Sequence, residues 1–339
     1  MIVICGEALI DMAPTSRGAE QGYIPHPGGS PYNVAVALGR LEVPVAFLGR
    51  LSRDFFGQRL REHLVANSVD NSYLVEGPEP TTLAFVYSGP GIEAQYAFWA
   101  ENSADRKLLP ADLPPTFPDE VLALHFGSFS LVLEPIATTL EQCMRREHGS
   151  RFISLDPNVR PGLIPDPDAY RTQLEDWVGL ADMVKVSRAD LAWLYPGEQV
   201  ERAARRWLEL GPSLVAVTAG AEGSMGFGRT EMVQVPGSAV EVVDTVGAGD
   251  AFSAGLLAWL HGEGRLRREL LDELSSADLT RLLAYANRVS AITCTRAGAD
   301  PPYRTEVEAS TLGTSPPVNT KVKRAARSPA SRKRRAGPG

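Results

Sequence analysis

Short runs of apolar and β-branched residues alternate along the chain with longer segments in which apolar residues recur every three to four positions. The strand-like runs are residues 1–6, 45–51, 121–127, 151–157, 182–187 and 213–220, and the helix-like segments include 54–66, 134–148 and 198–210. Strands that alternate with amphipathic helices are typical of a mainly parallel sheet with helices on both faces. The pattern therefore predicts an α/β fold, in which ligands bind at the carboxyl ends of the strands.

One stretch departs from this alternation. Residues 72–99 contain three consecutive strand-like runs, separated by turn residues and without a helical segment between them. Strands joined by short turns pair antiparallel. We therefore predict a small sheet here that covers one side of the binding site as a lid, and the N-terminal segment is a candidate for a further part of it.

Length and cysteine content narrow the class of protein. The 339 residues suffice for one large α/β domain or two ordinary ones. Cys5, Cys143 and Cys294 lie far apart and form no C-x-x-C pair, so neither a zinc knuckle nor a disulfide framework is indicated. The apolar N-terminus meets Asp11 too early for a signal sequence or a membrane span. We expect a reduced, cytoplasmic protein that does not associate with a membrane.

Charge is unevenly distributed along the chain. The formal net charge is −7, but the last nineteen residues carry eight Lys or Arg and no acid. Removing these eight from the 34 basic residues leaves 26 against 41 acidic ones, a net charge of −15 for the rest. An acidic body argues against nucleic acid as a partner, because affinity for the phosphate backbone needs a basic surface.

The C-terminal segment is rich in Pro, Ser, Ala and basic residues, a composition that cannot bury a core, so we expect it to be disordered. The predicted organisation is a single domain over residues 1–310 and a basic tail over 311–339. The tail is either an electrostatic tether to RNA or a membrane, or a solvated appendage, and we favour the appendage.

A glycine-rich segment late in the chain, DTVGAGDAFSAG (residues 244–255), is the first candidate for chemistry. Gly247, Ala248 and Gly249 precede Asp250 where an apolar helix begins, and such a helix start directs free N–H groups at one spot, which suits a phosphate oxygen. The carboxylate of Asp250 either caps the helix, since Asp is a favoured N-cap residue, or acts on the ligand. The segment matches neither the P-loop nor the G-x-G-x-x-G pattern.

Polar residues near other strand ends are further candidates. Gly28 and Gly29 precede a helix, and Asn33 falls one turn into it, where its amide can both donate to and accept from a hydroxyl. We expect Asp11 to close the first strand, where a carboxylate can hold two neighbouring hydroxyls. Arg160 follows the strand of residues 151–157, together with Asp156 and Asn158, and can meet a phosphate or pair with a carboxylate.

A third glycine motif, Thr218-x-Gly220-x-x-Gly223, follows another strand and is compatible with a simple turn as well as with a ligand site. The five histidines show no metal-binding spacing, and the G-x-S-x-G elbow of hydrolases is absent from the sequence. Metal-dependent and Ser-His-Asp hydrolase chemistry are therefore not indicated.

Taken together, these segments resemble the ribokinase and fructokinase type (PfkB) of carbohydrate kinase. Both family signatures occur in order, GGSPYNVAVALGRL near the front and DTVGAGDAFSAG near the back, and the resemblance covers roughly residues 1–305. HFGSFSL, SLDPNVRPGL and DMVKVSRADLAWL resemble the fructokinase branch. The resemblance implies a ribokinase-like fold: a central, mostly parallel sheet flanked by helices, with a small β-sheet lid over the sugar.

The resemblance also implies roles for individual residues. Asp250 would take the proton from the sugar hydroxyl, and Gly247, Ala248 and Gly249 would form the anion hole for the transferring phosphoryl group. The residues implied to hold the sugar are Asp11, Gly28, Gly29, Asn33 and Arg160. Those implied to lie near ATP are Ser187, Asp190, Thr218, Gly220, Gly223 and Asn287. Some family members bind a potassium ion, and the corresponding residues here are Asp244, Val246, Thr293 and Gly298.

Two departures from the family pattern bear on function. Relatives often carry N-x-x-E near the nucleotide and its Mg²⁺, where this chain has Ser187 and Asp190, an acid shorter by one methylene. Fructokinases and 2-keto-3-deoxygluconate kinases often carry an Arg in the lid where this chain has Ala100, which weakens the case for an acidic sugar more than for a neutral one.

We therefore expect an ATP- and Mg²⁺-dependent kinase that phosphorylates a primary hydroxyl of a small sugar, fructose in the first place. The alternatives are a 2-keto-3-deoxygluconate kinase or another sugar kinase of the same fold and, in a different class, an inactive sugar-sensing or scaffold protein. An intact Asp250 argues against the last, because a pure binder needs no base. The sequence leaves open whether the chain forms a homodimer.

Overall fold

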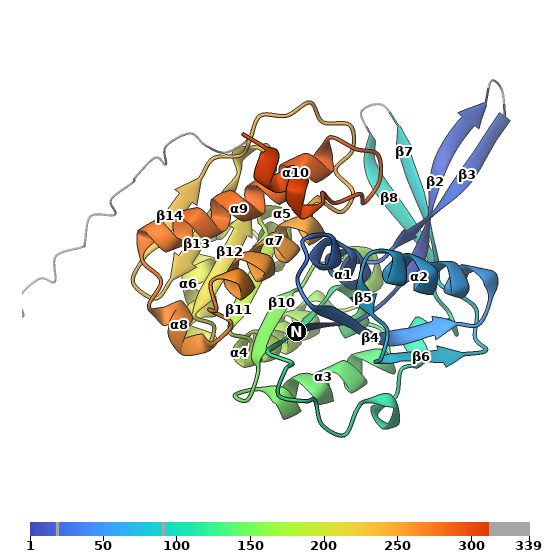
Figure 1. Cartoon of the computed structure of the whole chain (residues 1–339), viewed down its shortest axis with the longest axis horizontal. Coiled ribbons are helices and arrows are strands. Elements are labelled where there is room, and N and C mark those ends of the chain that lie inside the picture. Colours follow the sequence, from blue (N-terminus) through green and yellow to red (C-terminus); the bar gives the residue numbers. More distant parts are fainter. Residues whose placement is uncertain (18–19, 90–91, 312–339) are drawn as a thin grey trace, which may run out of the picture.

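The computed structural model describes residues 1–17, 20–89 and 92–311 (Figure 1). Its main sheet contains β1 (Ile2–Cys5), β4 (Val45–Ser52), β5 (Val69–Asp70), β6 (Leu74–Gly77), β9 (Ala123–Gly127), β10 (Phe152–Asp156), β11 (Met183–Ser187), β12 (Leu214–Thr218), β13 (Ser224–Gly228) and β14 (Met232–Val235). Within the described ranges these ten strands pair in the order β14-β13-β12-β11-β10-β9-β1-β4-β5, with β6 also paired to β4. In this order, each neighbouring pair from β12 through β11, β10, β9 and β1 to β4 is parallel, and β5 and β6 also pair in parallel with β4. β13 and β14 add an antiparallel edge next to β12.

Helices cover both faces of this sheet. They are α1 (Ser30–Arg40), α2 (Phe55–Ala66), α3 (Ile136–Glu147), α4 (Pro167–Leu180), α5 (Arg188–Leu194), α6 (Val200–Leu210), α7 (Ala248–Gly262), α8 (Arg268–Asp272), α9 (Ser276–Cys294) and α10 (Arg304–Ala309). Short 3-10 helices lie at Asp105–Lys107, Pro110–Asp112, Ser128–Leu131, Pro161–Leu163 and Gly220–Glu222.

Alternation along the strands divides the core into two layers. Ile2 and Ile4 of β1 pack with α1, α7 and α9, whereas Val3 and Cys5 pack with α3, α4 and α6. Successive side chains of a strand point to opposite faces, so a strand buried on both sides appears as a continuous apolar run. The predicted strands and helices therefore appear in the structure at nearly the predicted positions.

A second, smaller sheet projects from the main body beside α1 and α2 (Figure 1). It consists of β2 (Leu9–Arg17), β3 (Glu20–Gly28), β7 (Leu83–Gly89) and β8 (Ile92–Trp99), in the order β3-β2-β7-β8. The N-terminal segment thus supplies two of its described strands. The expectation that all of residues 72–99 belong to the lid is wrong at its start, because β6 pairs in parallel with the end of β4 and so belongs to the main sheet.

The expected position of Asp11 at the end of the first strand is also wrong. β1 ends at Cys5, and Asp11 is the third residue of β2 in the small sheet. The chain leaves the main sheet at Gly6, where a Cβ would lie 2.5 Å from Pro31 Cγ and 2.7 Å from Ser130 Oγ. There is thus little room for a side chain at the point where the chain changes sheets, and the long apolar run of the sequence spans two strands in different sheets.

Three other expectations concern the cysteines, membrane spans and the basic tail. The three cysteines form no disulfide, and Cys5 and Cys143 are buried. Among the residues that the structure describes, no helix has the length and apolar character needed to cross a membrane. The predicted basic tail lies, from residue 312 onward, outside the described residues.

Candidate active site

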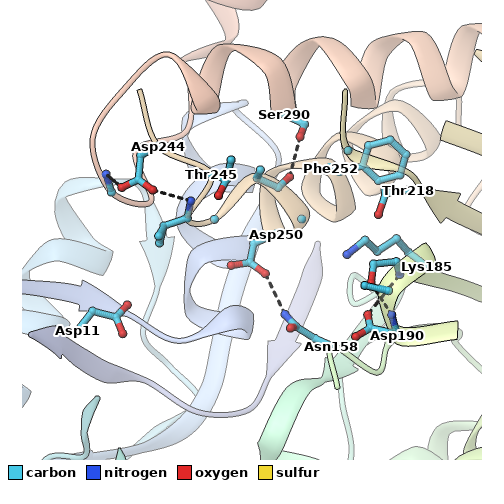
Figure 2. A pocket seen from close by; sticks show the side chains of 18 of the residues that line it. Asp11, Asn158, Lys185, Asp190, Thr218, Asp244, Thr245, Asp250, Phe252 and Ser290 are labelled. Carbon is cyan, nitrogen blue, oxygen red and sulfur yellow. Dashed lines mark hydrogen bonds between the residues drawn. The ribbon is translucent and has the colours of Figure 1, made fainter. Parts of the chain in front are cut away.

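A cavity of about 1030 Å³ opens at the carboxyl ends of β10, β11 and β12. Residues of β2 and β3 line its other side, so the small sheet faces the strand ends across it. In the view of Figure 2, Asp250 lies between Asp11 on one side and Lys185 and Asp190 on the other. This arrangement divides the cavity into two regions that meet at Asp250.

The first turn of α7 carries Asp250. Gly247 is the N-cap with a φ of 75°, a left-handed conformation that favours glycine, and a Cβ there would lie 2.6 Å from Ala299 Cβ. Asp250 is the third residue of the helix and makes no capping hydrogen bond. Instead, its carboxylate accepts hydrogen bonds from Ser30 Oγ at 2.7 Å and Asn33 Nδ2 at 2.9 Å. Asp250 is therefore not the N-cap of α7, and its carboxylate is held by α1 instead.

Burial raises the pKa of the Asp250 carboxyl, while the donors Ser30 and Asn33 and the positive charge of Lys185 oppose this shift. A carboxylate whose pKa moves toward neutrality is a better proton acceptor than an ordinary aspartate. The site therefore combines a defined orientation with increased basicity.

A buried ion pair lies beside the first turn of α7. Lys185 Nζ of β11 is 2.8 Å from Asp156 Oδ2 at the end of β10, and Ser253 Oγ donates to the same oxygen at 3.1 Å. A Cβ on Gly249 would lie 3.0 Å from Lys185 Nζ, so the ammonium is packed against the predicted anion hole. Burial lowers the pKa of Lys185, but the pairing with Asp156 and the nearby carboxylates outweigh this effect, so the pKa is raised and the ammonium stays charged.

Lys185 is not among the site residues predicted from the sequence. The available signal is a lysine in the middle of the apolar strand β11, a position where an unpaired charge would be strongly unfavourable. Ser30 was missed too, since a serine at a helix start has an ordinary role in capping. Its hydroxyl donates to Asp250 and accepts from Asn158 Nδ2 at 2.7 Å, which links three segments of the chain.

The residues implied to hold a sugar lie together on the small-sheet side of the cavity. The carboxylate of Asp11 packs against Gly28, where a Cβ would lie 2.1 Å from Asp11 Oδ2, so a side chain at position 28 would displace this carboxylate. Burial and the charge of Asp250 raise the pKa of Asp11 to about 7, and the nearby Arg160 opposes this shift. Gly29, Asn33, Arg160 and Asp250 line a chamber of about 70 Å³ with Asp11.

The residues implied to lie near ATP line the other region of the large cavity. They are Ser187, Asp190, Thr218, Gly220, Gly223 and Asn287. Ser187 and Asp190 also form a capping box at the start of α5: Ser187 Oγ accepts from the Asp190 N–H at 2.9 Å, and Asp190 Oδ2 accepts from the Ser187 N–H at 3.3 Å. Their spacing therefore has a local structural cause in addition to any contact with a nucleotide.

The residues implied to hold a monovalent cation lie on two neighbouring loops and the end of α9. Asp244 Oδ1 accepts from the Val246 N–H at 3.1 Å, and its Oδ2 accepts from the Gly298 N–H at 2.8 Å. Thr293 is buried in the last turn of α9, with its hydroxyl bonded to Val289 O. Among the described residues, no three His, Cys, Asp or Glu side chains form a metal-binding group.

Comparison with known proteins agrees with this geometry. Residues 1–306 match the model of the pfkB family of carbohydrate kinases, so the chain belongs to this family. A fructokinase of Rhizobium leguminosarum bv. trifolii is 43% identical over 281 residues, which cover 82% of this chain and 85% of that protein. The predicted family and the carbohydrate kinase class are confirmed.

Solved structures agree as well. The fructokinase of Xylella fastidiosa with bound ATP superimposes with a TM-score of 0.82 at 30% identity, covering 91% of this chain and 97% of that one. The fructokinase of Vibrio cholerae O395 has a TM-score of 0.79 at 30% identity and the same coverage; one structure of it holds fructose, ADP and calcium, and a double mutant holds fructose, ADP and potassium. The predicted ribokinase-like fold is confirmed, and the roles of the individual site residues stay predictions.

Proposed function

We propose that this protein is a fructokinase, which transfers the γ-phosphoryl group of ATP to a primary hydroxyl of fructose. The observation that carries the proposal is the position of the Asp250 carboxylate, which α1 holds at the start of α7 where the two regions of the cavity meet. A sugar hydroxyl on the Asp11 side and a phosphate on the Lys185 side would both reach this point. The similarity to fructokinases supports fructose as the sugar.

In this mechanism Asp250 accepts the proton of the attacking hydroxyl. Ser30 and Asn33 fix the direction of its carboxylate, and Asp11 and Arg160 hold the sugar so that one hydroxyl faces Asp250. Holding the two reactants in this geometry lowers the barrier in itself, and proton transfer to a positioned base lowers it further. The donors to Asp250 come from the segment that carries Gly28 and Gly29, so sugar binding and base orientation share one structural element.

The first turn of α7 would receive the transferring phosphoryl group. The backbone N–H group of Gly249 and the positive end of the helix dipole favour negative charge, whereas the Ala248 N–H donates to Thr245 O at 3.2 Å. The ammonium of Lys185 adds a full positive charge beside Gly249. Stabilisation of charge and positioning are the main contributions to phosphoryl transfer.

Mg²⁺ would neutralise the phosphate charge, as in other phosphoryl transferases. The site is compatible with Mg²⁺, because this ion binds mainly through substrate phosphates and water and needs only one or two carboxylates from the protein. Asp190 lines the nucleotide region and is the candidate carboxylate. Burial raises the pKa of Asp190, and the hydrogen bond with Ser187 and the charge of Lys185 oppose part of this rise.

The charges of the smaller chamber support a neutral sugar. Three carboxyl groups, those of Glu7, Asp11 and Asp250, line it, and Arg160 is the one cation among its described lining residues. Ala100, where relatives often carry an arginine, is buried and does not line the chamber. An acidic sugar such as 2-keto-3-deoxygluconate would add negative charge to this surplus of carboxylates.

The test is release of ADP from Mg-ATP in the presence of fructose, other neutral sugars, 2-keto-3-deoxygluconate and nucleosides. We expect fructose to give the highest kcat/KM. Preference for another compound would refute the proposed substrate, and no sugar-dependent release of ADP would favour a sugar-sensing or scaffold protein.

We also propose a potassium site on the loops of Asp244 and Gly298. The donor set implied by the family resemblance suits a hard cation, because the Asp244 carboxylate and backbone oxygens around Val246, Thr293 and Gly298 would be its ligands. A cation there would fix the loop that leads into Gly247 without touching the sugar. Its signature is activation by K⁺ over Na⁺.

Two further expectations complete the proposal. We propose a homodimer through the outer face of the small sheet, where Tyr23 and Trp99 are 47% and 63% exposed and both contact the ring of Phe85. Analytical ultracentrifugation of the parent and of Trp99→Lys measures this, and a monomeric parent would refute it. We also propose a cytoplasmic location, which the unpaired cysteines support and cell fractionation can test.

A further inference from the structure

One buried carboxyl group in the chamber has no partner. Glu7 lies in the connection between β1 and β2 and is 1% exposed. Neither of its carboxylate oxygens makes a hydrogen bond within the part of the chain that the structure describes. Glu7 nevertheless lines the same chamber as Asp11, Asn33 and Asp250.

The neighbouring hydroxyls do not satisfy this carboxyl group. Ser130 lies beside it, but the single proton of its hydroxyl is directed to Gly127 O at 2.7 Å, and this bond competes with any donation to Glu7. Ser128 is the second hydroxyl beside the carboxyl and also lines the chamber. A buried carboxyl group without a full set of partners is strongly unfavourable, and such exceptions in a folded protein call for a ligand, a water or a functional role.

Burial and the charge of Asp105 raise the pKa of Glu7 to about 7, and the hydroxyls of Ser128 and Ser130 oppose this shift. Near neutral pH the group therefore exists in both protonation states. A protonated carboxyl group can donate one hydrogen bond, and a carboxylate can only accept hydrogen bonds. Glu7 can therefore donate to the oxygen of a hydroxyl group or accept a hydrogen bond from it.

We propose that Glu7 is a further sugar-binding residue, whose carboxyl group bonds a non-reacting hydroxyl of the substrate and so contributes to substrate specificity. This inference rests on the proposed function, because it takes the chamber between Asp11 and Asp250 as the place of the sugar. The backbone supports it: a Cβ on Gly29 would lie 3.0 Å from Glu7 O, so the Glu7 segment packs against the glycine loop implied to hold the sugar.

The test compares the parent with Glu7→Ala and Glu7→Gln on fructose and on a panel of analogues that each lack one non-reacting hydroxyl. A site built to bond a hydroxyl rejects the analogue without it, and for a hydrogen bond to a charged group the expected penalty is about 10- to 100-fold in kcat/KM. We expect the parent to show this penalty at one position of the sugar. Glu7→Ala should lose the penalty at that position alone, and Glu7→Gln should keep part of it.

Asp105→Asn is the matched control. Asp105 is 2% exposed and lies close enough to Glu7 to affect its pKa, but it bonds Thr82 and Ser103 and does not line the chamber. This variant should keep the parent's pattern of penalties even if its melting temperature changes. If Glu7 had only a structural role, Glu7→Ala would likewise keep the parent's pattern of penalties.

The outcomes separate the two proposals. A parent that does not phosphorylate fructose refutes the proposed function. A parent that does, together with a Glu7→Ala variant that keeps the parent's penalty at every position, refutes the role of Glu7 alone. Loss of the penalty at one position in Glu7→Ala, with the control unchanged, supports it.

Discussion

The substitution Asp250→Asn tests the proposed base most directly. Asparagine keeps the size of the side chain and one acceptor oxygen, but it cannot take up a proton at neutral pH. The oxygen can stay with Ser30, at 2.7 Å from Oδ1, while the new NH₂ group faces Asn33, whose amide can turn to present its own oxygen. The hydrogen-bond network therefore survives the substitution.

The structure sets the expected magnitudes. A rearranged hydrogen bond changes stability by about 1 kcal/mol, and the neutral side chain removes the unfavourable burial of a charge, which offsets part of this loss. The melting temperature should therefore change by only a few degrees. Loss of a general base should lower kcat by about 10²- to 10⁴-fold, equivalent to about 3 to 5 kcal/mol in the barrier.

The assay is steady-state release of ADP, with thermal melts and nucleotide binding measured on the same samples. Asp278→Asn is the matched control, because Asp278 is also the third residue of its helix, α9, but lies outside the cavity. It should keep the parent's kcat and lose about 0.3–1 kcal/mol of helix stabilisation. In the parent, kcat/KM should fall as the pH drops through the raised pKa of Asp250. A folded Asp250→Asn variant with nearly parental kcat would refute the reasoning.

Four other predictions follow from the site and the sequence. The kcat/KM for fructose should exceed that for 2-keto-3-deoxygluconate, and the reverse order in a direct competition assay would contradict the charge argument for the chamber. Replacing Na⁺ by K⁺ should raise activity, and Asp244→Ala should abolish this response; equal parental rates in both salts would exclude a functional monovalent site. Deleting residues 321–339 should leave kcat and the melting temperature nearly unchanged, whereas a loss of several degrees would show that the tail docks on the body. The pKa of Asp11 is raised from 3.8 to about 7 by folding, so its contribution to stability is full below about pH 4 and is lost as the pH rises through about 7; Asp11→Asn should therefore raise the melting temperature more at about pH 8 than at about pH 5, and an equal change at both would contradict the shift.

Local patterns in the sequence were sufficient for the architecture of the main sheet. The apolar runs around β1, β4 and β9 to β12 predict strands close to their observed bounds, because a strand buried on both faces needs a continuous apolar segment. Local signals also predict the helix of residues 55–66, since Asp54 caps it by accepting a hydrogen bond from the Gly57 N–H. The two signature motifs identify the family, and with it the set of candidate residues.

Only the tertiary structure decided which of these residues meet. Asn33 and Asp250 are separated by 217 positions, and their hydrogen bond exists because α1 and α7 pack on the same face of the sheet. The sequence pattern also could not tell that the apolar run through Asp11 crosses from one sheet to another, since both strands need the same residue types. Glu7 was hidden in that run.

The same limit applies to the electrostatics. A sequence shows that Lys185 and Asp156 are charged, but their pairing at 2.8 Å and the raised pKa values of Asp11 and Glu7 depend on which distant atoms exclude water from them. Periodicity records which side of an element is apolar and nothing about its partner. The fold could therefore be predicted from local patterns, whereas the geometry of the site arises from contacts between segments far apart in the chain.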